Sequence, residues 1–337
     1  MANPTLKIVI PMAGYGTRLR PHTWSRPKQL IRMAGKTVLD YVLDTFSTLP
    51  ELSQIEFIFI VGYLGDKIET HMRETYPNLK VRYVEQSEMR GQSHAISLAK
   101  DYLSGPLLVL YVDTLIETNF SFLSTEKAGA VAWVKAVPDP RRFGVASLGG
   151  DGLVNHLVEK PKEVDNNLAV VGCYYFHSAE ELLEAIEEQM QRGIQLKNEF
   201  FLADAINIML EHGLKMRIER VETWLDAGTP DDVLNTNRYL LEHGHDNTAE
   251  SASRSNVVII PPVYIHPSAS VENSVIGPHA AIGATCQIHS CIIRDSIVDD
   301  CSQVTDVVME HSLIGQEVHI QRRAGILNVG DDTELML

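Results

Sequence analysis

A loop near the start of the chain combines glycines with cations. Gly14 and Gly16 follow closely on the apolar run Leu6–Ile10, and Arg18 and Lys28 come shortly afterwards. Glycine lets the backbone approach a phosphate closely, and successive backbone N–H groups form a cradle for anions. Arginine and lysine side chains bring positive charge to the same ligands. This combination predicts a site for a phosphorylated compound.

Two common phosphate-binding motifs do not fit this loop. A dinucleotide-binding fingerprint would need a third small residue at the position of Leu19. A P-loop that ends at Gly35-Lys36-Thr37 would need its first glycine at the position of Leu30. The sequence therefore supports neither a dinucleotide cofactor site nor a P-loop.

Composition limits the class of protein. A chain of 337 residues has room for about two domains. Its net charge of -15 argues against nucleic-acid binding, which requires clustered positive charge. The apolar run Leu6–Ile10 is too short for a secretory signal or a membrane span. We therefore expect a cytoplasmic protein that binds neither nucleic acid nor membrane and gathers its cations at a local phosphate site.

The elements that position this loop indicate an α/β domain over residues 1–242. The runs Leu6–Ile10, Phe57–Val61 and Leu107–Val112 are short and wholly apolar, which is typical of strands buried on both faces of a parallel sheet. Ser93–Leu103, between two of these runs, has helical character. The alternation of strand and helix predicts a Rossmann-like domain with a mostly parallel sheet.

The sequence changes character after a polar linker, residues 243–256. In residues 257–337 small aliphatic side chains recur about every six positions, a period typical of hexapeptide β-helix repeats. This region resembles the left-handed parallel β-helix. The repeating positions are Ile265, Val271, Ile276, Ile282, Ile288, Ile293, Val298, Val304, Val308, Ile314, Ile320 and Ile326.

An ordered series of short motifs over residues 8–230 resembles the signature of the sugar-phosphate nucleotidyltransferases. Each motif alone is a weak signal, whereas the complete series in this order is specific. The series comprises Gly14-x-Gly16-Thr17-Arg18-Leu19-x-Pro21, Arg26-Pro27-Lys28-Gln29-Leu30, Glu85-Gln86 with Gly91, Asp113, Phe143-Gly144-Val145, Glu159-Lys160-Pro161, Gly172, Glu199 and Trp224-Leu225-Asp226-Ala227-Gly228-Thr229.

The resemblance implies a reaction in which a sugar-1-phosphate oxygen attacks the α-phosphorus of a nucleoside triphosphate and pyrophosphate leaves. It implies that Arg18, Lys28, Asp113 and Asp226 are catalytic, and that the two aspartates bind one Mg²⁺. The implied nucleotide-binding residues are Gly14, Gly16, Thr17, Gln86 and Gly91. The implied sugar-phosphate-binding residues are Gly144, Glu159, Lys160, Gly172 and Glu199.

The same resemblance suggests the substrates. Gln86 offers both a donor and an acceptor to a base edge, which suits thymine or uracil. The overall pattern is most similar to long-form glucose-1-phosphate thymidylyltransferases, so dTTP or UTP and glucose-1-phosphate are the favoured substrates. GTP, ATP or another sugar phosphate remain alternatives. The chain departs from the family pattern at Arg32, where proline is usual, and at Gln92-Ser93-His94.

Three roles are open for the β-helix region. We expect it to assemble the chain into a homo-oligomer, a dimer or a tetramer. The alternatives are a regulatory role and a second, acyl-transferring site, which would make the protein a bifunctional nucleotidyl/acetyltransferase. A catalytically inactive regulatory subunit is the non-enzyme alternative. The presence of Arg18, Lys28, Asp113 and Asp226 argues for the enzyme.

Overall fold

The computed structural model describes residues 5–252, 254 and 256–322. The chain forms two compact units, one comprising Met1–Ile31 and Lys36–Val233 and the other Arg32–Gly35 and Leu234–Leu337. In the described part of the chain, no helix is both long and apolar enough to cross a membrane. The domain boundaries at residues 242 and 257 stay a prediction.

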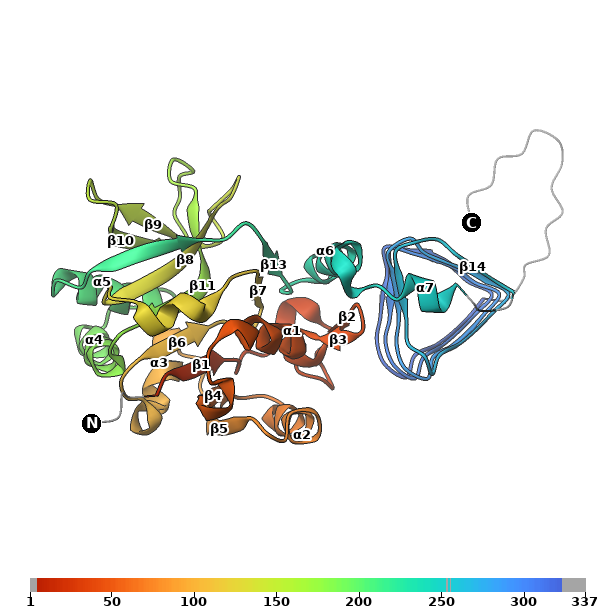
Figure 1. Ribbon diagram of the computed structural model, residues 1–337, viewed down its shortest axis with the longest axis horizontal. Helices are drawn as coiled ribbons and strands as arrows, with labels where there is room; N and C mark the ends of the chain where they lie inside the picture. The colour runs from red at the N-terminus through yellow and green to blue at the C-terminus, as the bar shows by residue number, and fades with distance from the viewer. Residues whose placement is uncertain (1–4, 253, 255, 323–337) are drawn as a thin grey trace. The chain divides into compact units, whose positions relative to one another are not determined.

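A nine-stranded sheet forms the centre of the first unit (Figure 1). Its main path runs β10-β9-β11-β6-β1-β4-β5, and β8 pairs with both β11 and β12. Strand β1 is parallel to β4 and β6, and β4 is parallel to β5. On the other side, β11 is antiparallel to β6, β8 and β9. The strands are β1 (Lys7–Pro11), β4 (Glu56–Val61), β5 (Lys80–Glu85), β6 (Leu107–Leu110), β8 (Ala130–Ala136), β9 (Gly144–Leu148), β10 (Val154–Glu159), β11 (Leu168–Phe176) and β12 (Met216–Arg220).

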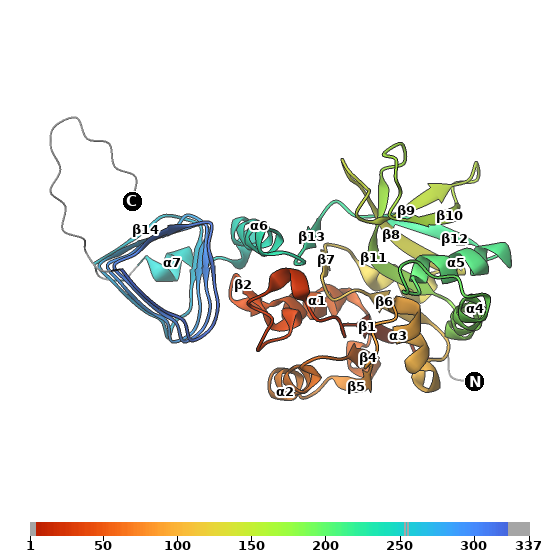
Figure 2. The same cartoon turned by 180° about the vertical axis from the view of Figure 1, so that it is seen from behind.

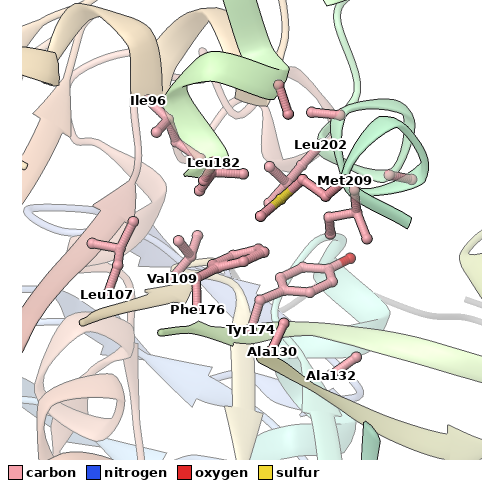
Figure 3. Close-up of a cluster of buried hydrophobic side chains, with 14 of the residues drawn as sticks. Ile96, Leu107, Val109, Ala130, Ala132, Tyr174, Phe176, Leu182, Leu202 and Met209 are labelled. Carbon is pink, nitrogen blue, oxygen red and sulfur yellow. The ribbon is translucent and has the colours of Figure 1, made fainter. Parts of the chain in front are cut away.

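Helices cover both faces of this sheet because its strands are apolar on both sides. On one face, Val109 and Phe176 pack with Leu182 of α4 and Leu202 of α5 (Figure 3). On the other face, Leu39 of α1 packs with alternate residues of β1 and β4. Figure 2 shows α1 and α4 on opposite sides of β6 and β1. The helices are α1 (Val38–Thr45), α2 (Gly65–Thr75), α3 (Gln92–Leu98), α4 (Ala179–Arg192) and α5 (Leu202–Glu211). The predicted α/β architecture is confirmed.

Short elements connect and extend this framework. Strands β7 (Thr114–Ile116) and β13 (Trp224–Asp226) form a separate antiparallel pair. Short 3-10 turns, η1 (Thr17–Leu19) and η2 (Lys28–Leu30), follow β1. The two-residue strands β2 (Arg32–Met33) and β3 (Lys36–Thr37) precede α1, and α6 covers Pro230–Leu240.

The second unit contains three four-stranded parallel sheets, seen in Figure 1 as the sides of a triangular prism. Equivalent residues of successive coils pair across each sheet, as Val271, Ile288, Val304 and Ile320 do. The predicted β-helix is confirmed. Its strands are β14 (Val257–Ile259), β15 (Val263–Ile265), β16 (Ser270–Glu272), β17 (Ser274–Ile276), β18 (Ala280–Ile282), β19 (Gln287–His289), β20 (Ile292–Arg294), β21 (Ile297–Val298), β22 (Gln303–Thr305), β23 (Val308–Glu310), β24 (Leu313–Ile314) and β25 (His319–Gln321).

The aliphatic repeat fills the interior of this prism with one exception. Residues from Ile265 to Val304 in the predicted series are at most 6% exposed. Val308, however, is 61% exposed, and Met309 takes the inward position at 9%. In the register of β20 and β23, Met309 pairs with the inward-facing Ile293, and Val308 pairs with Ile292, which is 37% exposed. Ile326 lies outside the described residues.

A short helix, α7 (Thr248–Ser251), covers the edge of the first coil. Asn247, just before it, accepts from the Ile265 N–H through Oδ1 and donates to the Ile265 carbonyl through Nδ2, both at 2.8 Å. The Thr248 hydroxyl accepts from the Val263 N–H at 3.1 Å. These bonds occupy backbone groups of β15 that would otherwise form an open strand edge.

Candidate active site

The strand topology of the first unit brings Asp113 and Asp226 together. Asp113 lies in the turn between β6 and β7, and Asp226 is the last residue of β13. In the β13–β7 pair Asp226 is opposite Thr114, the neighbour of Asp113. Both aspartates line a pocket with a volume of about 190 Å³. Two carboxylates 113 residues apart in sequence therefore share one site.

The two carboxyl groups have different electrostatic environments. Lys28 Nζ lies 2.6 Å from Asp113 Oδ2. Burial raises the pKa of Asp113, but the charge and hydrogen bond of Lys28 outweigh it and lower the pKa overall. Burial and the neighbouring Asp113 charge raise the pKa of Asp226 to about 6. Arg18 and Lys28 lower the pKa of Asp226 but do not fully offset burial and the Asp113 charge.

Arg18 reaches the same pocket from the loop after β1. Gly16 has φ of +63° and leads into the turn that carries Arg18. Gly228 leaves room for the guanidinium, because a Cβ atom at this position would lie 2.9 Å from Arg18 Nη2 and 2.9 Å from Asp226 Oδ1. The predicted catalytic residues Arg18, Asp113 and Asp226 all line the pocket, and Lys28 contacts it through Asp113.

Gln29 joins the cationic segment to the glycine loop. Its side chain is fully buried, and Nε2 donates to the Met12 carbonyl at 2.6 Å. The residue between Lys28 and Leu30 is thus a positioning group for both ends of the loop. The sequence motif includes Gln29 but assigns it no role, because a buried glutamine has no signal of its own in the sequence.

The antiparallel side of the sheet supplies the opposite wall of the pocket. Glu159 at the end of β10 pairs with Gly144 at the start of β9, and a Cβ atom on Gly144 would lie 3.1 Å from Glu159 Oε2. Burial raises the pKa of Glu159. Gly172 in β11 has φ of +82°, and a Cβ atom there would lie 2.6 Å from the Tyr111 ring. Gly144, Glu159 and Gly172 all line the pocket.

Two predicted sugar-phosphate residues lie beside the pocket rather than on its lining. The Lys160 side chain is 47% exposed, and its Nζ is 3.6 Å from Glu159 Oε1. The same ammonium lies 4.6 Å from the centre of the Phe201 ring, which does line the pocket. Glu199 is exposed, and its backbone forms a bridge with Leu196. The functional roles of Lys160 and Glu199 stay predictions.

The predicted nucleotide-binding residues are placed on loops next to the parallel strands. Gly14, Gly16 and Thr17 follow β1. Gln86 follows β5, is 5% exposed, and donates through Nε2 to the Gly91 carbonyl at 3.2 Å. Gly91 has φ of +95°, and a Cβ atom there would lie 2.5 Å from a backbone oxygen, that of Phe200. These five residues do not line the 190 Å³ pocket.

Several lining residues were absent from our predicted site. An aromatic pair, Phe143 and Trp224, has ring centroids 4.7 Å apart. Arg142 adds a cation next to this pair, and Tyr111 lies in the turn before Asp113. Arg142 is adjacent to the Phe143-Gly144 motif, and this position is the signal that could have identified it. Gln92, noted above as a departure from the family pattern, also lines the pocket.

Comparisons with known proteins identify two family matches and several similar proteins. The family described as nucleotidyl transferase matches residues 7–243, and the family described as GMPPB C-terminal domain matches residues 259–335. The chain is 30% identical to a glucose-1-phosphate thymidylyltransferase of Streptomyces antibioticus, over 94% of this chain and 93% of that protein. It is 34% identical to the bifunctional protein GlmU of Methanococcus maripaludis, over 69% of this chain and 54% of that protein.

A solved structure shares the fold of the catalytic unit. The nucleoside-diphosphate-sugar pyrophosphorylase from Vibrio cholerae RC9 aligns with a TM-score of 0.60 and 22% identity, over 68% of this chain and 99% of that one. The family match covers most of the chain, and the relative from Streptomyces antibioticus extends over nearly all of it. The chain therefore belongs to the nucleotidyl transferase family and is a sugar-1-phosphate nucleotidyltransferase.

Proposed function

We propose that the protein transfers a thymidylyl or uridylyl group from dTTP or UTP to glucose-1-phosphate. The observation that carries this proposal is one pocket that holds Arg18, Asp113 and Asp226 against Glu159 and Gly144. Cations and carboxylates suit a triphosphate with its metal ion, and a half-buried glutamate beside a glycine suits a sugar hydroxyl. The thymidylyltransferase of Streptomyces antibioticus supports the choice of substrates.

The proposed reaction is an in-line displacement at the α-phosphorus. An oxygen of the sugar phosphate forms a bond to this phosphorus, the bond to the bridging oxygen breaks, and pyrophosphate leaves with the electron pair. The nucleophile is already anionic, so no side chain has to remove a proton. Arg18 would hold the β- and γ-phosphates and Lys28 the α-phosphate. Their positive charges lower the repulsion between two polyanions and fix their relative orientation.

The aspartate pair fits a divalent metal ion. Members of this family generally use one. The pair offers two carboxylates as ligands. This donor set suits Mg²⁺, because this ion keeps several water molecules and binds substrate phosphates. Burial and the Asp113 charge raise the pKa of Asp226, and a bound cation would favour the charged form of this carboxylate. We propose that Asp113 and Asp226 hold Mg²⁺, which when bound would neutralise developing charge on the phosphates.

Lys28 has two partners in this scheme. In the structure its ammonium lies against Asp113. A triphosphate would offer the lysine a second anionic partner, while the metal ion would take its place beside the carboxylate. Lys160 and Glu199 would complete the sugar-phosphate site, as the family resemblance implies.

Gln86 supports a pyrimidine with a protonated N3. Its amide nitrogen donates to the Gly91 carbonyl and lies 3.1 Å from His94 Nδ1. The side-chain oxygen is then the group that would accept a hydrogen bond from the base. Thymine and uracil carry an N3–H donor, whereas cytosine and adenine present an acceptor at the corresponding ring nitrogen. Guanine carries a ring N–H, and GTP is therefore the competing substrate to include in the test.

We further propose that the β-helix assembles the chain into a homo-oligomer. On its sheet β14-β17-β20-β23 a row of aliphatic side chains faces outward, in which Val275 is half-buried and Val258, Ile292 and Val308 are exposed. Val258 and Val308 are 58% and 61% exposed. Adjacent exposed aliphatic side chains on a flat sheet are typical of protein interfaces. Analytical ultracentrifugation tests this, and a monomer at all concentrations would contradict it.

The proposed substrates are tested by pyrophosphate release with Mg²⁺ and glucose-1-phosphate across dTTP, UTP, GTP, ATP and CTP. We expect release with dTTP or UTP and less than about one hundredth of that rate with ATP and CTP. The variant Gln86→Leu should reduce this discrimination. Equal rates with GTP would contradict the base assignment, and turnover only with a different sugar phosphate would contradict the assignment of glucose-1-phosphate.

A further inference from the structure

The side-chain amide of Gln86, the residue proposed above to contact the base, faces two hydrogen-bond acceptors of the catalytic unit. Its Nε2 donates to the Gly91 carbonyl at 3.2 Å and lies 3.1 Å from His94 Nδ1. Gln86 is 5% exposed, and its backbone N–H donates to the Val61 carbonyl of β4 at 2.8 Å. An amide nitrogen carries two N–H groups, so these two acceptors match both of them.

The Gly91 carbonyl is fixed by backbone hydrogen bonds. It also accepts from the Ala95 N–H at 3.1 Å in the first turn of α3. The preceding residue, Arg90, accepts through its carbonyl from the Phe200 N–H at 2.8 Å. A Cβ atom on Gly91 would lie 2.5 Å from the Phe200 carbonyl oxygen, so the loop packs closely against this residue. The first acceptor for the Gln86 amide therefore has a fixed position.

His94 supplies the second acceptor from the first turn of α3. An amide nitrogen only donates, so Nδ1 of His94 accepts and the ring proton is on Nε2. Burial and then the Arg90 charge lower the pKa of His94, and the Glu88 charge opposes them. A lowered pKa favours the neutral ring, which has a nitrogen that can accept. The neutral imidazole is thus suited to hold the Gln86 amide nitrogen.

The two acceptors together decide which end of the Gln86 amide faces them. A flipped amide would place its oxygen against the Gly91 carbonyl and His94 Nδ1, so that both acceptors would lose their donor. We propose that His94 is a positioning residue that keeps the Gln86 oxygen available to the base and so favours bases with an N3–H group. The inference rests on the proposed role of Gln86. Because Gly91 would still hold one N–H group in a variant without His94, we expect weaker discrimination and not its complete loss.

UTP and CTP give the sharpest test, because both carry a pyrimidine on ribose and the bases differ only at N3 and C4. The readout is kcat/KM for UTP divided by kcat/KM for CTP, with glucose-1-phosphate and Mg²⁺. His94→Leu and His94→Ala should each lower this ratio about fivefold, because the amide loses one of its two acceptors. In His94→Asn the side-chain oxygen can replace Nδ1 as the acceptor. This variant should therefore stay within about twofold of the parent enzyme.

Two controls separate positioning from damage to the helix. Ser97→Ala removes the hydrogen bond from Ser97 Oγ to the His94 carbonyl, 2.8 Å long, but leaves the His94 side chain in place. It should change the ratio by less than about twofold. In a Gln86→Leu background, His94→Leu should also change the ratio by less than about twofold, because the amide that His94 positions is absent.

The outcomes distinguish the inference from the proposed function. An unchanged ratio in the His94→Leu and His94→Ala variants would overturn the inference, as would a failure of His94→Asn to restore the ratio. An equal effect of His94→Leu with and without Gln86 would also overturn it. Melting temperatures identify variants that remain folded, and two different replacements are used so that the test does not depend on one of them. A parent enzyme that uses UTP and CTP equally well would instead contradict the base assignment of Gln86, and the inference would fall with it.

Discussion

Half-buried carboxyl groups in the pocket and in the β-helix have different electrostatic environments. In the catalytic unit, burial raises the pKa of Asp226 and of Glu159, and both residues line the pocket. In the β-helix, Asp295 is also partly buried, yet His311 and Arg238 lower its pKa overall. At the pocket, Arg18 and Lys28 only partly offset the burial of Asp226, whereas in the β-helix neighbouring cations more than offset the burial of Asp295. Incomplete compensation is expected where a protein binds an external cation or phosphate.

The largest expected effect comes from removing one charge of the pocket. Asp113→Asn or Asp226→Asn should lower kcat at least about a hundredfold, because the metal ion would lose a ligand and the phosphates their charge compensation. Both variants should stay folded at the assay temperature. Asp295→Asn, which removes a carboxylate from the β-helix, is the control and should stay within about twofold. A pocket variant with near-normal turnover would contradict the difference between the units.

Alanine substitution should destabilise the protein more at a left-handed glycine of the pocket than at a left-handed glycine elsewhere. Gly172→Ala should lower the free energy of unfolding by about 3 kcal/mol, since the new Cβ would meet the Tyr111 ring. Gly193 has a similar φ of +66° but has nothing within 4 Å of the Cβ position. Gly193→Ala should therefore lower it by about 1 kcal/mol. Urea unfolding measures both, and equal losses would show that contact with Tyr111 adds nothing.

Stability of the β-helix should depend on which way a side chain faces. Met309→Ala should lower the free energy of unfolding by about 2 kcal/mol, because it leaves a cavity inside the prism. Val308→Ala, next to it in sequence but exposed, should change it by less than about 0.5 kcal/mol in the monomer. The comparison is made by thermal unfolding at low protein concentration. A larger loss from Val308→Ala would show that the inward positions are assigned wrongly.

The smallest effect is a pH dependence of stability. The pKa of Asp226 is raised from 3.8 to about 6 in the folded protein. The folded state therefore holds this proton more tightly than the unfolded state, and the associated stability is lost as the pH rises through 6. Between about pH 4 and pH 7 the wild type should lose about 1 to 2 kcal/mol relative to Asp226→Asn. If the difference in free energy of unfolding between the wild type and Asp226→Asn were the same at both pH values, the raised pKa would be contradicted.

Sequence reasoning identified the architecture because both units have strong periodic patterns. Wholly apolar strand runs indicated the parallel strands, and the six-residue repeat indicated the β-helix. The prediction that Val308 faces inward is wrong. Valine and methionine are both apolar, so the repeat pattern did not distinguish Val308 from Met309. The antiparallel half of the sheet was not predicted in detail, since strand pairing depends on contacts between residues far apart in sequence.

The residues of the candidate site were predicted from sequence motifs, so residues outside these motifs received no role. The motifs placed Asp113 and Asp226 in one site, and the β13–β7 register supplies the geometric reason. They did not assign roles to Arg142 or Gln29, whose positions depend on the tertiary fold. Arg32 departs from the family pattern, and its partner Asp300 lies 268 residues further along the chain. Such a pair cannot be inferred from spacing.

The most direct test of the carboxylate pair is calorimetric titration with α,β-methylene dTTP, which the enzyme cannot cleave, in the presence of either Mg²⁺ or EDTA. We expect Mg²⁺ to strengthen binding to the wild type and to Asp295→Asn by about tenfold or more. Asp113→Asn and Asp226→Asn should bind the analogue with nearly the same affinity in both conditions. If these two variants kept the full Mg²⁺ dependence of the wild type, the pair would not hold the metal ion and the central assignment would be wrong.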